Sequence, residues 1–148
     1  KYKNLYNSLS SYGVGFHRHN SEIQQMLKKY TKNKFDFIFT PHLSPMFRGI
    51  LSTIYVDLNK NVNQKNIIGK LKDYYKNHKF IKILNPNALI STNDVINTNK
   101  CLISICKTQY KDKIVILSAI DNLIKGGAGQ AIQNLNIKFN FPIETGLK

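Results

Sequence analysis

One stretch near the end of the chain indicates a β-sheet core: Lys113-Ile114-Val115-Ile116-Leu117-Ser118-Ala119-Ile120. From Ile114 onward, its odd and even positions are both apolar except at Ser118, so both faces of the strand are expected to be buried. Such a strand is typical of a central position in a sheet. A short loop that holds Tyr110 to Asp112 joins it to a second strand at 100–108, and the pair predicts a β-hairpin.

Working outward, the hydrophobic periodicity predicts further strands at 35–39, 50–58 and 80–84. Helices are expected at 21–30, at 64–77 and from Ala128 to about Phe139, before Pro142. Residues 40–45 contain two prolines and are expected to stay outside regular pairing, and residues 88–97 are ambiguous. The order of elements predicts an α+β domain, with helices on one face of a mixed or mainly antiparallel sheet.

Composition limits the class of protein. The chain has 148 residues, 42% of them apolar, which suits one domain with a buried core. No apolar run reaches the roughly 18 residues that a membrane span needs, and no signal peptide is recognisable. With only two cysteines, reduced thiols and a cytoplasmic setting are expected. The first residue is Lys1 rather than Met, which suggests a fragment or a processed chain. Two cysteines provide neither a disulfide framework nor a zinc site, and no metal is expected.

The net charge of +14 raises the possibility of nucleic-acid binding. Of the 22 basic residues, however, only Arg18 and Arg48 are arginines, and the lysines are spread without a cluster. Proteins that read bases and phosphates favour the bidentate fork of arginine. We therefore expect no nucleic-acid partner, and the two arginines become candidates for binding a substrate carboxylate or phosphate. Structural ion pairs are the alternative interpretation of both arginines.

A pair of histidines precedes the first predicted helix, in the run His17-Arg18-His19-Asn20-Ser21-Glu22-Ile23. Ser21 with Gln24 has the spacing of a capping box, so the helix is expected to begin near Ser21. An imidazole at a helix N-terminus stays neutral more readily, and the Glu22 carboxylate can orient it. Two solvated histidines in a surface loop are the simpler interpretation.

Three glycines mark the start of the last helix, in the run Asp121-Asn122-Leu123-Ile124-Lys125-Gly126-Gly127-Ala128-Gly129-Gln130-Ala131. Glycine lowers helix propensity, so a specific requirement is expected at these positions. Close approach of the backbone to a ligand is one explanation, and close packing of the helix on the sheet is the other. Spacing alone favours neither.

Three motifs in register resemble the N-acetyl-γ-glutamyl-phosphate reductase family of the semialdehyde dehydrogenase superfamily. They are the histidine run, the run Phe39-Thr40-Pro41-His42-Leu43-Ser44-Pro45-Met46-Phe47-Arg48-Gly49-Ile50 and the glycine-rich run. The resemblance implies a two-part enzyme of which this chain is the second part. Residues 1–120 would form a substrate-binding and dimerisation domain, and residues 121–148 a helix that packs on an absent NADP-binding Rossmann domain. The nucleophilic cysteine would lie upstream, so the fragment alone is expected to be inactive.

The resemblance also implies the chemistry, which is NADPH-dependent reductive dephosphorylation of N-acetyl-glutamyl phosphate to the semialdehyde in arginine biosynthesis. His19 is the expected acid/base with His17 as the alternate, and the sequence alone does not separate them. Glu22 would orient the imidazole. Arg18 and Arg48 would bind the substrate. The residues expected to contact the cofactor are Asn122, Lys125, Gly126, Gly127 and Gly129.

Three alternatives stay open at this point. An aspartate-semialdehyde dehydrogenase-like enzyme would perform the same chemistry on a shorter acyl phosphate. A basic nucleic-acid-binding module and a purely structural dimerisation unit are the other two. As an enzyme, the intact protein is expected to be a homo-oligomer that binds a small acyl-phosphate substrate and no membrane.

Overall fold

The computed structural model of the chain describes residues 7–31 and 35–148. The chain divides into two compact units, Lys1–Phe47 and Arg48–Lys148, which are described separately below. Residues 121–148 belong to the second unit together with the sheet. Their packing on a further domain, with a boundary at residue 120, stays a prediction.

The described part of the first unit contains one helix and a short strand pair. Helix α1 spans His19–Tyr30, and strands β1 (Ser10–Ser11) and β2 (His42–Leu43) pair antiparallel. The expectation that residues 40–45 stay unpaired is wrong for His42 and Leu43. Both prolines lie outside this pair, and Pro41 only accepts a hydrogen bond through its carbonyl, from the Tyr12 N–H at 3.1 Å.

Two further predictions for the first unit are corrected. The strand expected at 35–39 is not formed. Alternation of apolar residues indicates which side chains would share one face of a strand, but a strand also needs a neighbour to pair with. Helix α1 begins at His19, two residues earlier than expected, and the Ser21–Gln24 capping box is absent. The Ser21 hydroxyl instead donates to the carbonyl of Arg18 at 2.9 Å, inside the first turn.

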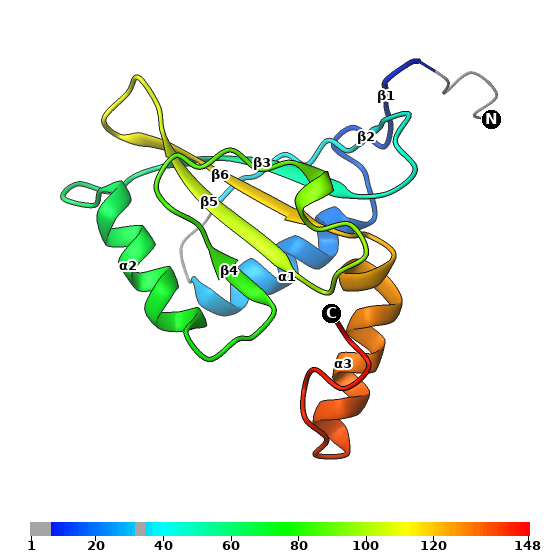
Figure 1. Cartoon of the computed structure of the whole chain (residues 1–148). Coiled ribbons are helices and arrows are strands. Elements are labelled where there is room, and N and C mark those ends of the chain that lie inside the picture. The colour runs from blue at the N-terminus through cyan, green and yellow to red at the C-terminus, as the bar shows by residue number, and fades with distance from the viewer. Residues whose placement is uncertain (1–6, 32–34) are drawn as a thin grey trace. The chain divides into compact units, whose positions relative to one another are not determined.

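The second unit, all of whose residues are described, is built on a four-stranded sheet (Figure 1). Its strands are β3 (Ile50–Asp57), β4 (Ile81–Ile83), β5 (Cys101–Lys107) and β6 (Lys113–Ile120), in the spatial order β3-β6-β5-β4. Only the β4–β5 pair is parallel. The prediction of a mixed, mainly antiparallel sheet with the 113–120 strand inside it is therefore confirmed.

Apolar side chains pack on both faces of this sheet. Helix α2, Gln64–Tyr75, places Ile68 against Ile105 and Ile114 on one face. On the other face, Ile90 and Val95 from the ambiguous 88–97 segment pack with buried residues of β5 and β6, Leu102 and Ala119. This segment forms a short 3₁₀ turn, Thr92–Asp94, rather than a helix or strand. Two covered faces explain why β6 is apolar at both odd and even positions.

The chain leaves β6 through a π-helical segment, Ile124–Ala128, that is kinked at Gly127, where φ and ψ are not helical. It then continues as helix α3, Gly129–Lys138. Figure 1 shows the C-terminal segment folding back alongside α3. Buried Asn136 holds this segment, donating from Nδ2 to the carbonyls of Ile143 and Thr145 at 3.2 and 2.9 Å. None of the helices in the described ranges has the length and hydropathy for crossing a bilayer.

Candidate functional site

The two histidines of the first motif are neighbours in the first unit. The backbone N–H of His19 donates to Nδ1 of His17 at 3.2 Å, and the two rings meet edge to face with centroids 4.6 Å apart. Tyr12 and Phe39 lie against His17, with ring centroids at 5.3 and 5.4 Å. Because a backbone N–H can only donate, Nδ1 of His17 is the acceptor, and its Nε2 is the nitrogen left for other partners.

His17 is half-buried, whereas His19 is exposed at the first position of α1. Over the described residues, no hydrogen bond joins Glu22 to either imidazole, so its orienting role stays a prediction. Asn20, which sequence reasoning passed over, donates from Nδ2 to the Gly15 carbonyl at 2.5 Å. Its buried Oδ1 has no partner within the described chain. Arg18, next to these residues, is exposed at the N-cap of α1.

Arg48 binds a protein carboxylate in the second unit. Its Nε lies 3.0 Å from Oδ2 of Asp121, and its Nη2 lies 3.1 Å from Oδ1. The third nitrogen, Nη1, donates to Oδ1 of Asn97 at 3.0 Å. The Asp121 side chain is completely buried, and that of Arg48 is 17% exposed. This is the geometry expected for the structural interpretation of Arg48; its substrate role stays a prediction.

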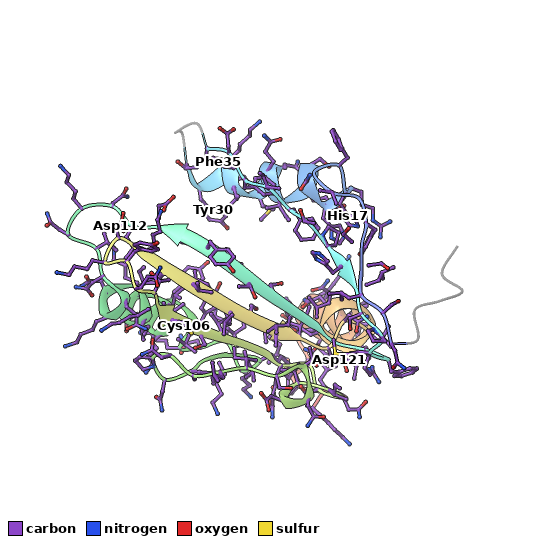
Figure 2. All side chains as sticks on the ribbon, turned by 90° about the horizontal axis from the view of Figure 1, so that it is seen from above. His17, Tyr30, Phe35, Cys106, Asp112 and Asp121 are labelled. Atoms are coloured by element: carbon purple, nitrogen blue, oxygen red, sulfur yellow. The ribbon has the colours of Figure 1, made fainter. Side chains whose placement is uncertain are left out.

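Asp121 follows β6 directly, at the start of the glycine-rich run (Figure 2). Burial disfavours its charge, but the N–H groups of Asn97, Ile124 and Leu123, together with Arg48, outweigh that cost and lower the pKa of Asp121. The three N–H donors lie 2.8, 3.0 and 2.9 Å from its carboxylate oxygens. Sequence reasoning missed this role, although an Asp placed immediately before a helical pattern is a recognised capping signal.

The glycines of the second motif have different environments. Gly129 is buried, and a Cβ there would lie 2.6 Å from Oδ1 of Asn99 and 2.5 Å from Cγ2 of Ile124. Close packing therefore explains Gly129. Gly126 and Gly127 are exposed, so a ligand can approach their backbone without meeting a side chain.

Lys125 is turned toward α3. Its Nζ donates to Oε1 of Gln133 at 2.8 Å and lies 5.8 Å from the ring centroid of Phe80. Partial burial lowers the pKa of Lys125, while the nearby Cys101 has the opposite, smaller effect. Asn122, three residues earlier in the chain, accepts the Gly49 N–H through Oδ1 at 2.6 Å.

The site residues predicted from the sequence thus form two groups. The histidines, Arg18 and Glu22 lie in the first unit, and the remainder lie at the end of the sheet in the second. Within the described residues, no three His, Cys, Asp or Glu side chains are grouped so that they could hold a metal ion.

Comparisons with known proteins agree with this architecture. Residues 1–122 match the family model "Semialdehyde dehydrogenase, dimerisation domain". Among solved structures, an aspartate semialdehyde dehydrogenase II from Vibrio cholerae superposes with a TM-score of 0.51 at 18% identity. The superposition covers 67% of this chain and 30% of that one, and it is evidence for the fold alone.

Curated relatives are considerably more similar. An N-acetyl-gamma-glutamyl-phosphate reductase of Halothermothrix orenii is 44% identical over 95% of the chain, and one of Thermoanaerobacter pseudethanolicus 40% over 99%. A probable chloroplastic reductase of the same name from Arabidopsis thaliana is 41% identical over 99%. The chain spans 41%, 44% and 36% of the lengths of these three proteins. Because the family model covers most of the chain, the protein belongs to the family of semialdehyde dehydrogenase dimerisation domains.

Proposed function

We propose that the complete protein is an N-acetyl-γ-glutamyl-phosphate reductase, an NADP-dependent oxidoreductase of arginine biosynthesis. It would convert N-acetyl-glutamyl phosphate to N-acetylglutamate semialdehyde. The observation that carries this proposal is the 40–44% identity, over nearly the whole chain, to relatives with that name. The fold likeness to an aspartate semialdehyde dehydrogenase adds no support for a shorter substrate.

In this proposal His19 is the proton carrier for a cysteine nucleophile that another part of the protein supplies. His17 is less suited to that role, because its Nδ1 already accepts the His19 N–H. The ring nitrogens of His19 have no hydrogen-bond partner among the described side chains and backbone groups. A general acid or base must have a ring nitrogen available to the reacting group, and His19 would meet that condition.

The residues of the glycine-rich run fit a dinucleotide. Gly126 and Gly127 are exposed, a Cβ at Gly127 would lie 3.3 Å from the carbonyl oxygen of Asn122, and Asn122 precedes Gly126 by four residues in the same run. NADPH, when bound, supplies the hydride. The Lys125 ammonium donates one of its three N–H groups to Gln133, and the other two would be available to the cofactor.

The proposal also assigns a partner to one side of α3. Ile132, Leu135 and Phe139 lie on one side of this helix and are 41%, 49% and 60% exposed, while Gly129 and Asn136 are buried. An N-terminal NADP-binding domain would cover that apolar side.

We further propose that the protein is a homo-oligomer, in keeping with the family's description as a dimerisation domain. We also propose that it is cytoplasmic and that it binds neither nucleic acid nor membrane.

A substrate assay of the complete protein tests the function. The reverse reaction, with N-acetylglutamate semialdehyde, phosphate and NADP, should produce NADPH absorbance. Turnover of aspartate semialdehyde alone would contradict the proposal and support the aspartate-semialdehyde dehydrogenase alternative. A gel shift with DNA or RNA at low salt would test the nucleic-acid alternative.

A further inference from the structure

The antiparallel β3–β6 ladder ends in a cluster of polar contacts. Ile50 pairs with Ile120, so the residues just beyond the ladder, Arg48 and Gly49, lie near Asp121 and Asn122. Here the backbone ladder is replaced by side chains, with Arg48 bound to Asp121 and the Gly49 N–H bound to Asn122. We call Arg48, Gly49, Asn97, Asp121 and Asn122 the β3–β6 latch.

Asp121 is the centre of the latch. Its Oδ1 accepts from the N–H groups of Leu123 and Ile124 and from Arg48, and its Oδ2 contacts the Asn97 N–H and Nε of Arg48. One buried carboxylate therefore connects three segments of the chain: the start of β3, the loop before β5 and the first turn of the glycine-rich run. Removing its charge would leave the largely buried Arg48 without a counter-ion, which is costly.

The latch also sets the direction of the Asn122 amide. Because the Gly49 N–H can only donate, Oδ1 of Asn122 must face Gly49, and Nδ2 must face away from it. That Nδ2 donates to no other group of the described chain. The Nδ2 group of Asn122 is therefore a hydrogen-bond donor held in one orientation, which a ligand can use.

We infer that Arg48, Gly49 and Asp121 are positioning residues, which hold the 122–128 backbone and the Asn122 Nδ2 donor in place for an acceptor atom of the dinucleotide. None of the three needs to touch the cofactor. The inference rests on the proposed function, because it assigns a dinucleotide to this run.

The test measures NADPH binding to the complete protein by fluorescence titration. Asp121→Asn should raise the Kd for NADPH at least about tenfold, because the loop loses its charged anchor, whereas the exposed Asp73→Asn should leave the Kd unchanged. A double variant, Arg48→Gln with Asp121→Asn, removes both charges. It should bind NADPH more tightly than Asp121→Asn alone, which a simple sum of two losses would not produce.

A second measurement is independent of the cofactor. Amide hydrogen exchange in residues 123–128 should be faster in Asp121→Asn than in the wild type and unchanged in Asp73→Asn. An Asp121→Asn protein with a lower Tm but an unaltered Kd for NADPH would overturn the inference. If the wild type itself bound no NADPH, the proposed function would fail. In that case, an unchanged rate of amide hydrogen exchange at residues 123–128 in Asp121→Asn would also overturn the positioning role of the latch.

Discussion

At the scale of single residues, Gly49 is a position with little freedom to change. Its φ is +109°, a conformation that L side chains rarely adopt, and a Cβ would lie 2.7 Å from Cβ of Thr92. The same residue donates its N–H to Asn122, so its backbone cannot rotate away without breaking the latch. Conformation and space therefore require glycine here, and the hydrogen bond to Asn122 keeps the backbone in that conformation.

Gly49→Ala should therefore destabilise the complete protein by roughly 1–3 kcal/mol, seen as a lower urea midpoint. Gly69→Ala is the matched control. Gly69 lies within α2 with no atom close to a new Cβ, and alanine has the higher helix propensity. That variant should be as stable as the wild type or more so by up to about 1 kcal/mol. Equal stability of the two variants would contradict this account of Gly49.

Asp121 should make stability depend on acid pH. Its pKa is lowered in the folded state, so the unfolded chain takes up the proton first as the pH falls. The stabilisation is complete above the ordinary carboxyl range near pH 4 and is lost as the pH falls through the lower folded value. In urea midpoints measured from pH 6 to pH 2, Asp121→Asn should show a smaller decline than the wild type. An identical decline would mean that other carboxylates cause the acid sensitivity.

The two histidines should differ in their effect on turnover. His19→Asn in the complete enzyme is expected to lower kcat by several orders of magnitude, and His17→Asn by about tenfold through loss of its contact with the His19 N–H. Steady-state kinetics of both variants, with circular dichroism to check folding, would decide. A larger loss in His17→Asn would reverse the assignment.

At the scale of elements, α3 differs from an ordinary amphipathic helix. Its buried residues are Gly129 and Asn136, and its large apolar side chains are exposed. Gly129 allows the helix to approach Asn99, and Nδ2 of Asn99 donates to Gln133 at 2.9 Å. Further along, Asn136 binds two carbonyls of the C-terminal segment, and the N–H of Asn99 donates to the Lys148 carbonyl at 2.6 Å. Hydrogen bonds therefore replace much of the apolar packing that usually holds a helix.

Asn136→Ala should release the C-terminal segment. It removes the two hydrogen bonds that the buried Asn136 side chain donates to the carbonyls of half-buried Ile143 and exposed Thr145, with an expected loss of about 1–3 kcal/mol in stability. Limited proteolysis followed by mass spectrometry should show faster cleavage within 140–148 than in the wild type. Asn134→Ala is the control, because Asn134 is exposed and only accepts from Gln130 one turn away. Equal cleavage in both variants would exclude this role for Asn136.

At the scale of the whole molecule, many large apolar side chains of the described residues are exposed. The outer side of α3 is one such area, and the proposed N-terminal domain is its expected partner. A lysine placed there would be buried without a counter-charge in the complete protein, but it would be solvated in this chain alone.

Leu135→Lys should therefore lower the Tm of the complete protein by several degrees while leaving the isolated chain nearly unaffected. Asn134→Lys, on the neighbouring exposed position, should change neither. Differential scanning calorimetry of both forms makes the comparison. An equal Tm for Leu135→Lys and Asn134→Lys in the complete protein would show that this side of α3 stays in solvent.

The sequence by itself determined the order of the main elements of the second unit, the central place of β6 and the motifs that resemble the family, because periodicity and motif spacing are local properties. In the first unit it placed a strand at 35–39 that is not formed and missed the β1–β2 pair, because pairing depends on a partner strand that no local pattern supplies. It placed the α1 start wrongly, since the hydrogen bond from the His19 N–H to the His17 ring is not visible in a capping pattern. Only the tertiary structure decided that Arg48 binds Asp121, 73 residues away, and that Gly129 faces Asn99. Such contacts follow from how the β3–β6 ladder and α3 bring distant segments together, and no local pattern encodes that.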